Sequence, residues 1–355
     1  MKTTINREAL TKAVQVVSRA VEKKSTMPVL GHIRLQMEGK AGSVTGTDLE
    51  TSIIYPIEGN CAKKLDILLP ANRFLGILRD AQNFEKEANI EPTEDNRAIV
   101  SHATLCTLPS GEFPTLPVPE EDSQHFELEG LEEAMSKVIE AAGESDSRYV
   151  LNALYFDFPG KRIVATDGHR LHLVKYPFPD AEFLLLVPKK SIPLLKGEKI
   201  KVTISKKDQR VMGFFDNGQY TLIVRFLEGT YPNVDNVIPK EKGAIQFTVH
   251  KQALLGLCIE NLPINADRSN ASRFIVKPGS LTIETINPGV AENKASINAK
   301  LTGDTDFACG FNLAFVIDVL KVLEGTEVTF KMHDSLSPCK IEEDGFLALI
   351  MPMRI

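Results

Sequence analysis

Apolar and polar residues alternate along several short stretches, which recur at a nearly constant distance along the chain. Each stretch is followed by a glycine, and these glycines are 121 and 119 positions apart. The stretches and their glycines are residues 33–37 with Gly39, 154–158 with Gly160, and 274–276 with Gly279. A period of two predicts half-buried antiparallel strands, and each glycine suits a tight hairpin turn with positive φ. We therefore infer three copies of one unit.

Two further markers keep nearly the same spacing, of 119 and 118 positions. Thr47, Thr166 and Thr285 each follow a stretch rich in β-formers and are 119 positions apart. The sequence Gly-Glu-Phe-Pro at 111–114 also returns as Gly-Thr-Tyr-Pro at 229–232. Coincidence is a poor explanation for several markers that share one period, so the repeat is a property of the fold.

Each unit also contains apolar residues at helical spacing, which predicts an amphipathic helix followed by a second helix. The apolar stripes lie at residues 10–21, 131–142 and 254–262, and the second helices are expected at 71–82, 189–196 and 312–323. Two helices packed on one face of antiparallel sheet make an α+β unit. Proline and charge clusters at 114–122 and 238–243 predict linkers. The domains are then expected at 1–121, 122–242 and 243–355.

Composition narrows the class of protein further. With 355 residues the chain is too long for one core, and no apolar run approaches the roughly 20 residues that span a membrane. The N-terminus lacks the apolar segment of a secretory signal, and the five cysteines are scattered without a CxxC motif. These features predict a cytoplasmic protein with reduced thiols. The net charge of −6 argues against a nucleic-acid grip over the whole surface, but it permits a basic inner surface.

Several segments, in order along the whole chain, resemble the bacterial DNA polymerase III beta subunits, which form the beta sliding clamp family. The most specific are Thr-Asp-Gly-His-Arg-Leu at 166–171 and the closing Met-Pro-Met-Arg-Ile at 351–355. Supporting segments lie at 26–31, 46–50, 148–152 and 311–312. The resemblance implies three repeats of the DNA-clamp fold and a head-to-tail dimer that forms a six-domain ring.

The resemblance also implies a function without chemistry in the chain itself. Such a clamp is a DNA replication processivity factor that encircles duplex DNA, independent of its sequence. It is a non-catalytic subunit of a complex whose activity is that of a DNA-directed DNA polymerase, a nucleotidyltransferase. An ATP-driven clamp-loader complex loads it. The implied partners are a second copy of the chain, the DNA polymerase III alpha subunit and other proteins with a clamp-binding motif. We expect no cofactor, no metal and no membrane contact.

Three sets of residues follow from the resemblance together with the local pattern. DNA contact is expected from basic or aromatic residues of the helices and one loop: Lys12, Arg19, Lys24, Arg73, Arg148, Tyr149, Lys189, Lys190 and Lys196. A peptide-binding pocket is expected from Leu151, Thr166, Gly168, His169, Arg170, Leu171, Pro232, Val237, Asn312, Phe315, Leu336, Ile350, Met351, Pro352, Met353 and Arg354. The alternation of residues 99–105 predicts an exposed edge strand, so a dimer interface is expected from Ala103, Leu105, Ile259, Leu262 and Phe274.

Two other classes of function remain open from the residues alone. Asp167 and His169 suit a general acid–base pair, and His169 with His172 has the spacing of metal ligands on a helix. The neighbouring residues favour a strand, however, and a strand would point residues 169 and 172 to opposite faces. No phosphate-binding loop or nucleophile elbow is present. The other class is a DNA-binding structural protein without polymerase partners.

The sequence departs from the family pattern at three pocket positions. Phe315 stands where tyrosine is common, which removes a hydroxyl group from the expected pocket floor. Asn236 replaces a frequent arginine, and Pro338 replaces a small polar residue. These departures put the affinity for partners in doubt.

Overall fold

The computed structural model describes residues 2–22, 26–80, 86–144, 147–207, 210–239, 245–265, 271–302 and 306–354. Two compact units divide the chain, and each contains one large antiparallel sheet. The first unit comprises residues 1–131 and 190–226, and the second comprises residues 132–189 and 227–355. The expected α+β class with antiparallel sheet is confirmed.

The first unit is built on a sheet that begins and ends at short strands. Its strands are β1 (Thr3–Asn6), β2 (His32–Thr47), β3 (Thr51–Pro70), β4 (Glu87–Thr93), β5 (Arg97–Val100), β6 (Ala103–Cys106), β7 (Gln124–Glu129), β12 (Lys199–Lys207), β13 (Arg210–Asp216) and β14 (Thr221–Arg225). They run in the order β6-β5-β4-β1-β3-β14-β13-β12-β7, with β2 paired to β3.

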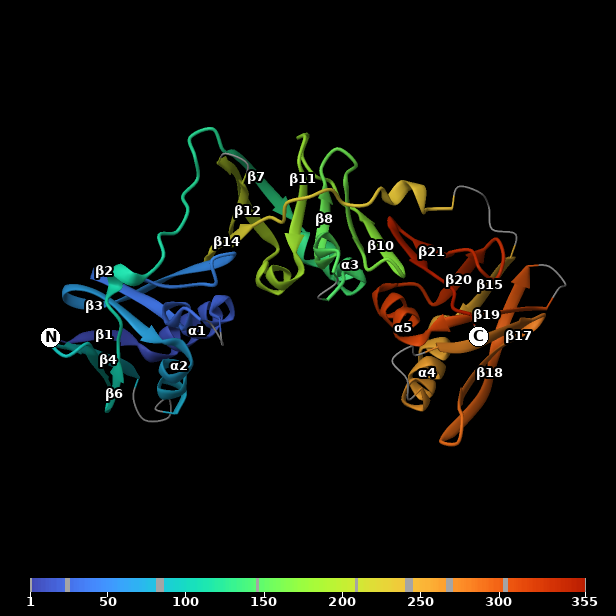
Figure 1. The fold of residues 1–355 in the computed structure, drawn as a ribbon, viewed down its shortest axis with the longest axis horizontal. Helices are drawn as coiled ribbons and strands as arrows, with labels where there is room; N and C mark the ends of the chain where they lie inside the picture. The colour runs from blue at the N-terminus through green and yellow to red at the C-terminus, as the bar shows by residue number, and fades with distance from the viewer. Residues whose placement is uncertain are drawn as a thin grey trace. The chain divides into compact units, whose positions relative to one another are not determined.

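Two helices of the first unit lie next to each other, as Figure 1 shows: α1 (Arg7–Val17) and α2 (Ala71–Asp80). The Asn6 side chain caps α1 by accepting a hydrogen bond from the Ala9 N–H at 3.0 Å. Helix α1 buries Leu10, Ala13, Val14 and Val17, as the apolar stripe predicts. Residues 81 and 82 of the expected second helix lie outside the described residues.

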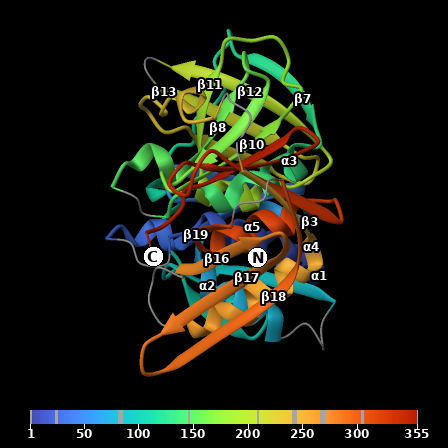
Figure 2. The ribbon, with the colours of Figure 1, turned by 90° about the vertical axis from the view of Figure 1, so that its right-hand side faces the viewer.

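The second unit holds the remaining strands. They are β8 (Ala153–Asp157), β9 (Arg162–Thr166), β10 (Arg170–Lys175), β11 (Leu184–Pro188), β15 (Ile245–His250), β16 (Ala271–Lys277), β17 (Gly279–Asn287), β18 (Ala291–Thr302), β19 (Phe307–Asn312), β20 (Glu327–Met332), β21 (Cys339–Glu343) and β22 (Phe346–Ile350). Their order is β11-β8-β9-β10-β22-β21-β20-β15-β18-β17-β16-β19. Strands β17 and β18 form a long hairpin, visible in Figure 2.

The other helices are α3 (Leu131–Val138), α4 (Lys251–Asn261) and α5 (Leu313–Val322), of which α4 and α5 contact each other. Short 3₁₀ helices are η1 (Ser18–Ala20), η2 (Pro28–Gly31), η3 (Ser110–Glu112), η4 (Ile139–Ala141), η5 (Tyr149–Asn152), η6 (Lys189–Leu194), η7 (Val234–Asn236) and η8 (Leu262–Ile264). No helix among the described residues is long and apolar enough to span a membrane.

Both sheets continue across the joints between the expected domains. Strand β3 pairs with β14, with Ile54 opposite Thr221. Strand β10 pairs with β22, with Leu171 opposite Leu349. The compact units therefore divide residues 122–242 between them instead of following the expected linkers.

The repeat is visible in side-chain geometry as well as in spacing. The Thr47 hydroxyl accepts the Leu49 N–H at 3.0 Å, and the Thr166 hydroxyl accepts the Gly168 N–H at the same distance. In both turns the following aspartate accepts two more backbone N–H groups through one carboxylate oxygen. The two Thr-Asp turns thus have one construction, and the second carries the candidate site.

Four expectations about local structure are wrong. Gly160 does not have the expected positive φ, which occurs instead at the next residue, Lys161, with φ 49°. Segment 189–194 is a 3₁₀ helix, not an α-helix, because Pro193 cannot donate an α-helical hydrogen bond. Gly39 has the expected positive φ of 63°, but it lies at a register shift inside the continuous strand β2. Helix α4 buries Leu254, Leu257, Cys258 and Asn261, so its buried face is rotated from the expected stripe and Ile259 is exposed.

Candidate functional site

An apolar cleft of about 160 Å³ opens in the second unit where β10 begins and β22 ends. The residues that line it are Arg148, Leu151, Thr166, Gly168, Arg170, Leu171, Pro232, Asn233, Val234, Val237, Pro338, Leu349 and Met351. The second Thr-Asp turn, the segment after the Gly-Thr-Tyr-Pro motif and the chain end therefore meet at one place. Apolar side chains predominate, and few polar groups are present to orient a ligand.

The wall formed by the Thr-Asp turn requires a glycine. Gly168 has φ +87°, and a Cβ atom there would lie 2.8 Å from the Arg148 guanidinium. Arg148 covers this glycine while its Nη2 donates to the Asp167 carbonyl at 3.2 Å. A guanidinium at the rim can bind a carboxylate or carbonyl oxygen of a ligand.

Arg170, by contrast, is a cation whose hydrogen bonds are made inside the protein. Its Nε donates to Asp167 at 3.0 Å, its Nη1 donates to Asp318 at 2.5 Å, and its Nη2 donates to the Glu140 carbonyl. The guanidinium carbon also lies 4.3 Å from the centre of the Phe315 ring. Arg170 thus ties α5 to the Thr-Asp turn, and its charge is already compensated.

The floor of the cleft belongs to a buried cluster that includes Leu151, Leu171, Val234 and Leu349. Tyr231 of the Gly-Thr-Tyr-Pro motif extends this cluster and stacks on Tyr155, with ring centres 4.9 Å apart. At the rim, 51% of Val237 and 39% of Met351 remain exposed to solvent. Apolar side chains exposed beside an apolar cleft mark a place where a partner binds.

Backbone hydrogen bonds fix the end of the chain beside the cleft. The Met351 N–H donates to the His169 carbonyl at 2.9 Å, and the Met353 N–H donates to the Gly310 carbonyl at 2.8 Å. Of the closing residues that the structure describes, 351–354, only Met351 lines the cleft. Residues 351–353 are thus held in place, not left as a free apolar end.

The structure brings together half of the expected pocket residues. Those that line the cleft are Leu151, Thr166, Gly168, Arg170, Leu171, Pro232, Val237 and Met351. Those that do not are His169, Asn312, Phe315, Leu336, Ile350, Pro352, Met353 and Arg354. Two of these have other roles, since the Asn312 side chain caps α5 at 2.9 Å and Phe315 packs on Arg170.

Sequence reasoning missed Arg148, Asn233, Val234, Pro338 and Leu349 as cleft residues. Arg148 was expected to contact DNA, and Pro338 was noted only as a departure from the family pattern. The continuous apolar run of β22, which is typical of a strand buried on both faces, was a usable signal for Leu349. Val234 carried another signal, because it follows the Gly-Thr-Tyr-Pro motif by two positions.

The residues expected to contact DNA fall into two groups. Lys12, Arg19 and Arg73 of the first unit are exposed, as are Lys196 and Tyr149. Lys189 instead donates to the Ala142 carbonyl at 2.9 Å and pairs with Glu144, and Lys190 pairs with Asp48 and Glu50. Their charges are partly compensated within the protein. Lys24 lies outside the described residues.

The expected dimer residues differ in exposure. Ile259 is 52% exposed, and Ala103 and Leu262 are half-buried. Leu105 and Phe274 are buried at 6% and 0% exposure, and Phe274 packs against Phe311. A side chain within the core of its own unit offers no surface to a second chain, so we remove Leu105 and Phe274 from the expected interface.

The geometry also bears on the enzyme alternative. Both carboxylate oxygens of Asp167 accept hydrogen bonds from its own turn, one from the His169 and Arg170 N–H groups and the other from Arg170 Nε. His172 is fully buried, and burial lowers its pKa to about 4. The described residues contain no cluster of three or more side chains suited to a metal ion. These side chains therefore have structural roles in the turn and the core.

The fold and the cleft define a class of repeat-built binding proteins with an apolar site at the joint of two repeats. Models of the DNA polymerase III beta subunit match the chain over its N-terminal domain at 1–117, its central domain at 126–233 and its C-terminal domain at 235–354. The beta sliding clamps of Pseudomonas putida and Escherichia coli K12 are each 29% identical to it, over the full length of both chains.

Solved structures agree. The DNA polymerase III subunit beta of Pseudomonas aeruginosa superimposes with a TM-score of 0.86 at 28% identity, over 100% of both chains. The beta sliding clamp of Caulobacter crescentus, solved with polyethylene glycol at a putative beta-motif tethering region, gives 0.88 at 27%, also over both full chains. The chain belongs to the DNA polymerase III beta subunit family, the beta sliding clamps. It is a DNA replication processivity factor and a non-catalytic subunit of the polymerase.

Proposed function

We propose that two copies of this chain close head to tail into a six-domain ring around duplex DNA. In this ring the cleft of each copy tethers the DNA polymerase III alpha subunit, the clamp loader and other proteins with a clamp-binding motif. The domains are those expected at 1–121, 122–242 and 243–355. The observation that carries the tethering role is the cleft itself, whose apolar walls and exposed Val237 and Met351 suit an extended peptide.

The dimer is supported by two sheet edges. Strand β6 ends the sheet of the first unit. Residues 291–298 of β18 pair with β17 but have no strand on their other side among the described residues. An unpaired edge is a template for another chain, and pairing β6 of one copy with β18 of the other gives a head-to-tail contact. Helix α4 contacts β18, which brings the exposed Ile259 to the same edge.

DNA contact is supported by the exposed cations of the first unit. Lys12, Arg19 and Arg73 lie on or directly after helices that contact each other, and they form no ion pair with any other described residue. Few phosphate contacts give weak, salt-sensitive affinity. Such weak affinity is sufficient for a ring, because a closed ring stays on DNA by topological linkage. An ATP-driven clamp loader would open the ring, since the chain has no phosphate-binding loop.

We place the protein in the cytoplasm, where bacterial replication takes place. The thiols agree with a reducing compartment, because every cysteine is free and only Cys106 is exposed. Burial raises the pKa of the Cys258 thiol to about 12, which keeps it protonated and unreactive.

The test distinguishes a loss of peptide binding at the cleft from a loss of ring closure. Val237→Asp places a charge on an exposed cleft wall, and Leu184→Asp, at a side chain that is 59% exposed on β11, is the matched control. We expect Val237→Asp to weaken binding of a polymerase C-terminal peptide at least tenfold, about 1.4 kcal/mol, in isothermal titration calorimetry. It should shorten polymerase runs on primed circular DNA, and Leu184→Asp should change neither quantity.

Both variants should remain on closed circular DNA and slide off after the circle is linearised. Loss of retention with Val237→Asp would show that the substitution disturbs the ring. Unchanged peptide affinity would place the peptide site elsewhere. Retention of the parent protein that does not depend on closure of the DNA would contradict the topological tether.

A further inference from the structure

An ion pair joins one wall of the cleft to the sheet of the second unit. This wall, the linker wall, is formed by residues 232–237, of which Val234 and Val237 line the cleft on either side of Asp235. Arg162, the first residue of β9, donates from its two terminal nitrogens to the two carboxylate oxygens of Asp235, at 2.6 and 2.9 Å. A two-point contact of this kind fixes the orientation of the carboxylate as well as its distance.

A second carboxylate orients Arg162 from within the sheet. Asp157 ends β8 and lies opposite Arg162 in the register of β8 and β9. One of its oxygens accepts the Arg162 Nε–H at 2.7 Å, and the other accepts the Gly160 N–H at 2.9 Å. The side chains of Asp157 and Arg162 are 8% and 20% exposed, whereas that of Asp235 is 57% exposed. The sheet therefore fixes the arginine, and Asp235 is the outer partner that the arginine restrains.

The face of the sheet that carries Arg162 also carries the floor of the cleft. Because side chains alternate along a strand, Arg162, Val164 and Thr166 of β9 point to one face. Val164 belongs to the buried cluster beneath the cleft, and Thr166 lines the cleft itself. Val234 belongs to the same buried cluster. The linker wall is thus packed on the floor through Val234 and tied to the sheet through the next residue, Asp235.

The internal repeat indicates that the fold does not require this ion pair. Arg162 lies four positions before the second Thr-Asp turn, and Ser43 lies at the same distance before the first. Asp235 lies three positions after Gly-Thr-Tyr-Pro, and Pro117 lies at the same distance after Gly-Glu-Phe-Pro. The first repeat therefore has neither partner of the ion pair at the matching position.

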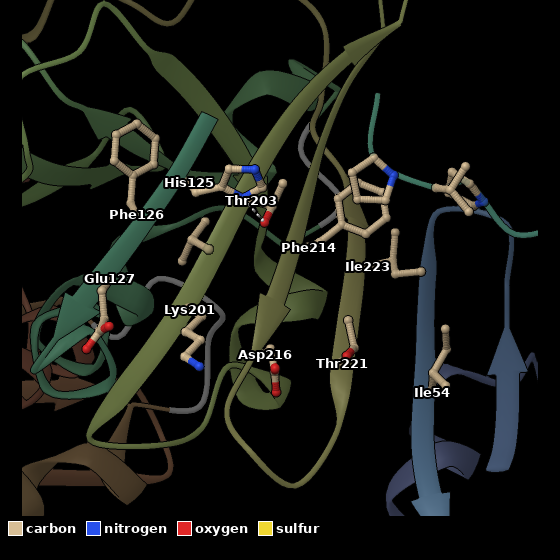
Figure 3. A pocket seen from close by; sticks show the side chains of 14 residues that line it. Ile54, His125, Phe126, Glu127, Lys201, Thr203, Phe214, Asp216, Thr221 and Ile223 are labelled. Atoms are coloured by element: carbon tan, nitrogen blue, oxygen red, sulfur yellow. Dashed lines mark hydrogen bonds between the residues drawn. The ribbon is translucent and has the colours of Figure 1, made fainter. Parts of the chain in front are cut away.

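The first linker has no charged side chain with which to make such a contact. Residues 114–119 are Pro-Thr-Leu-Pro-Val-Pro. Figure 3 shows the face that this linker borders, where Pro117, Val118 and Pro119 share a hollow of about 680 Å³ with Phe214 and Ile223. An ionic attachment of the linker therefore accompanies the joint that forms the cleft, and it is absent from the equivalent segment at the first joint.

We propose that Arg162 is a positioning residue for peptide binding, which holds the linker wall in the conformation that accepts the peptide. This inference rests on the proposed function of the cleft. A wall that is ordered before binding loses less conformational entropy when the peptide binds, and the affinity is higher for that reason. An ion pair with one exposed partner changes an equilibrium constant by roughly fivefold at most, which sets the size of the expected effect.

Removal of the outer carboxylate tests this role while the pair of Arg162 and Asp157 stays in place. Asp235→Ala removes the charge, and Asp235→Glu restores it. Asp180→Ala is the matched control, because Asp180 is the exposed ion-pair partner of Lys161, the residue before Arg162, at 2.5 Å. The probe is the C-terminal peptide of the DNA polymerase III alpha subunit, titrated calorimetrically into the full-length protein. We expect Asp235→Ala to bind it about threefold to fivefold more weakly, Asp235→Glu to recover most of the loss, and Asp180→Ala to bind as the parent does.

Amide hydrogen exchange distinguishes positioning from a general loss of stability. The Val237 N–H donates to the Val234 carbonyl at 3.2 Å, so its exchange reports on the linker wall. In free Asp235→Ala, residues 233–238 should exchange faster than in the parent, with β8, β9 and the melting temperature unchanged, and bound peptide should remove the difference.

Three results would each overturn the positioning role: equal peptide affinity of Asp235→Ala and the parent, unchanged exchange at residues 233–238, or faster exchange throughout the second unit. Absence of peptide binding by the parent would instead contradict the proposed function. Exchange in the free protein would then decide by itself whether the ion pair holds the linker wall.

Discussion

Replacing Arg170 with methionine should both destabilise the second unit and weaken peptide binding at the cleft. The guanidinium donates to Asp167, Asp318 and a carbonyl group, and it lies over the Phe315 ring. Its side chain is 11% exposed, and the two aspartates are 18% and 21% exposed. Methionine preserves much of the apolar stem but leaves two largely buried carboxylates without their cation.

The size of the effect follows from this burial. Breaking a fully buried, hydrogen-bonded ion pair by removing one partner costs about 3–5 kcal/mol. Because both aspartates retain some contact with water, we expect about 2–3 kcal/mol here. For a unit of this size each kcal/mol lowers the melting temperature by roughly 2–4 °C, so a decrease of about 5–10 °C is expected. The variant also loses the hydrogen bond from Arg170 to Asp318 of α5. The Thr-Asp turn that forms one wall of the cleft is then no longer held against α5.

Differential scanning calorimetry and peptide titration should be run on this variant and on Arg34→Met. Arg34 is a matched control, because it pairs with Asp66 at 2.7 Å and lies 5.9 Å from the Phe113 ring, in the first unit. Both variants should melt earlier, but only Arg170→Met should lose peptide affinity, by tenfold or more. A melting temperature within 1 °C of the parent, or unchanged peptide affinity, would refute the structural role assigned to Arg170.

Three further predictions concern other parts of the chain. Burial holds the pKa of His172 at about 4, below its ordinary 6.5, so protonation of the unfolded state should remove about 3 kcal/mol of stability as the pH falls from 6.5 to 4. Urea titrations should show this dependence, and His172→Gln should reduce it; an unchanged slope would contradict the assignment. Ile259→Asp should give folded monomers in sedimentation equilibrium, and a stable dimer would place the interface elsewhere. Replacing Lys12, Arg19 and Arg73 with alanine should reduce the salt slope of linear-DNA binding by roughly two to three units; an unchanged slope would remove these residues from the DNA surface.

Local patterns predicted most of the secondary structure, because each element has an apolar face that must be buried. The stripe of α1 and the alternation of residues 154–158, most of which form β8, could be read for this reason. The family resemblance, and not the spacing, placed residues 166–171 at a pocket. The turn itself is local, because the Thr166 hydroxyl and the Asp167 carboxylate complete it from within four residues. Short-range hydrogen bonds of this kind can be predicted from the sequence.

Features that depend on distant residues or unusual backbone were not predicted. The segment 99–105 resembles one strand, but Ser101 adopts φ +54° and turns it into the β5–β6 hairpin. This turn has no glycine, asparagine or proline to signal it, and the Arg7 guanidinium supports it with a hydrogen bond to the Ser101 hydroxyl at 2.6 Å. The turn directs Leu105 to the buried face. Likewise, nothing local to Arg148 shows that Gly168 leaves room for its guanidinium.

The pairing of β3 with β14 has a consequence for synthesis of the chain on the ribosome. Ile54 emerges long before its strand partner Thr221, and ribosomes add about 5–20 residues each second, so β3 lacks this neighbour for roughly 8–30 seconds. During that time an apolar strand edge is open to pairing with other nascent chains. The sheet of the first unit therefore cannot be completed until β14 has been synthesised. We expect chaperones that shield strand edges to bind the nascent chain during this time.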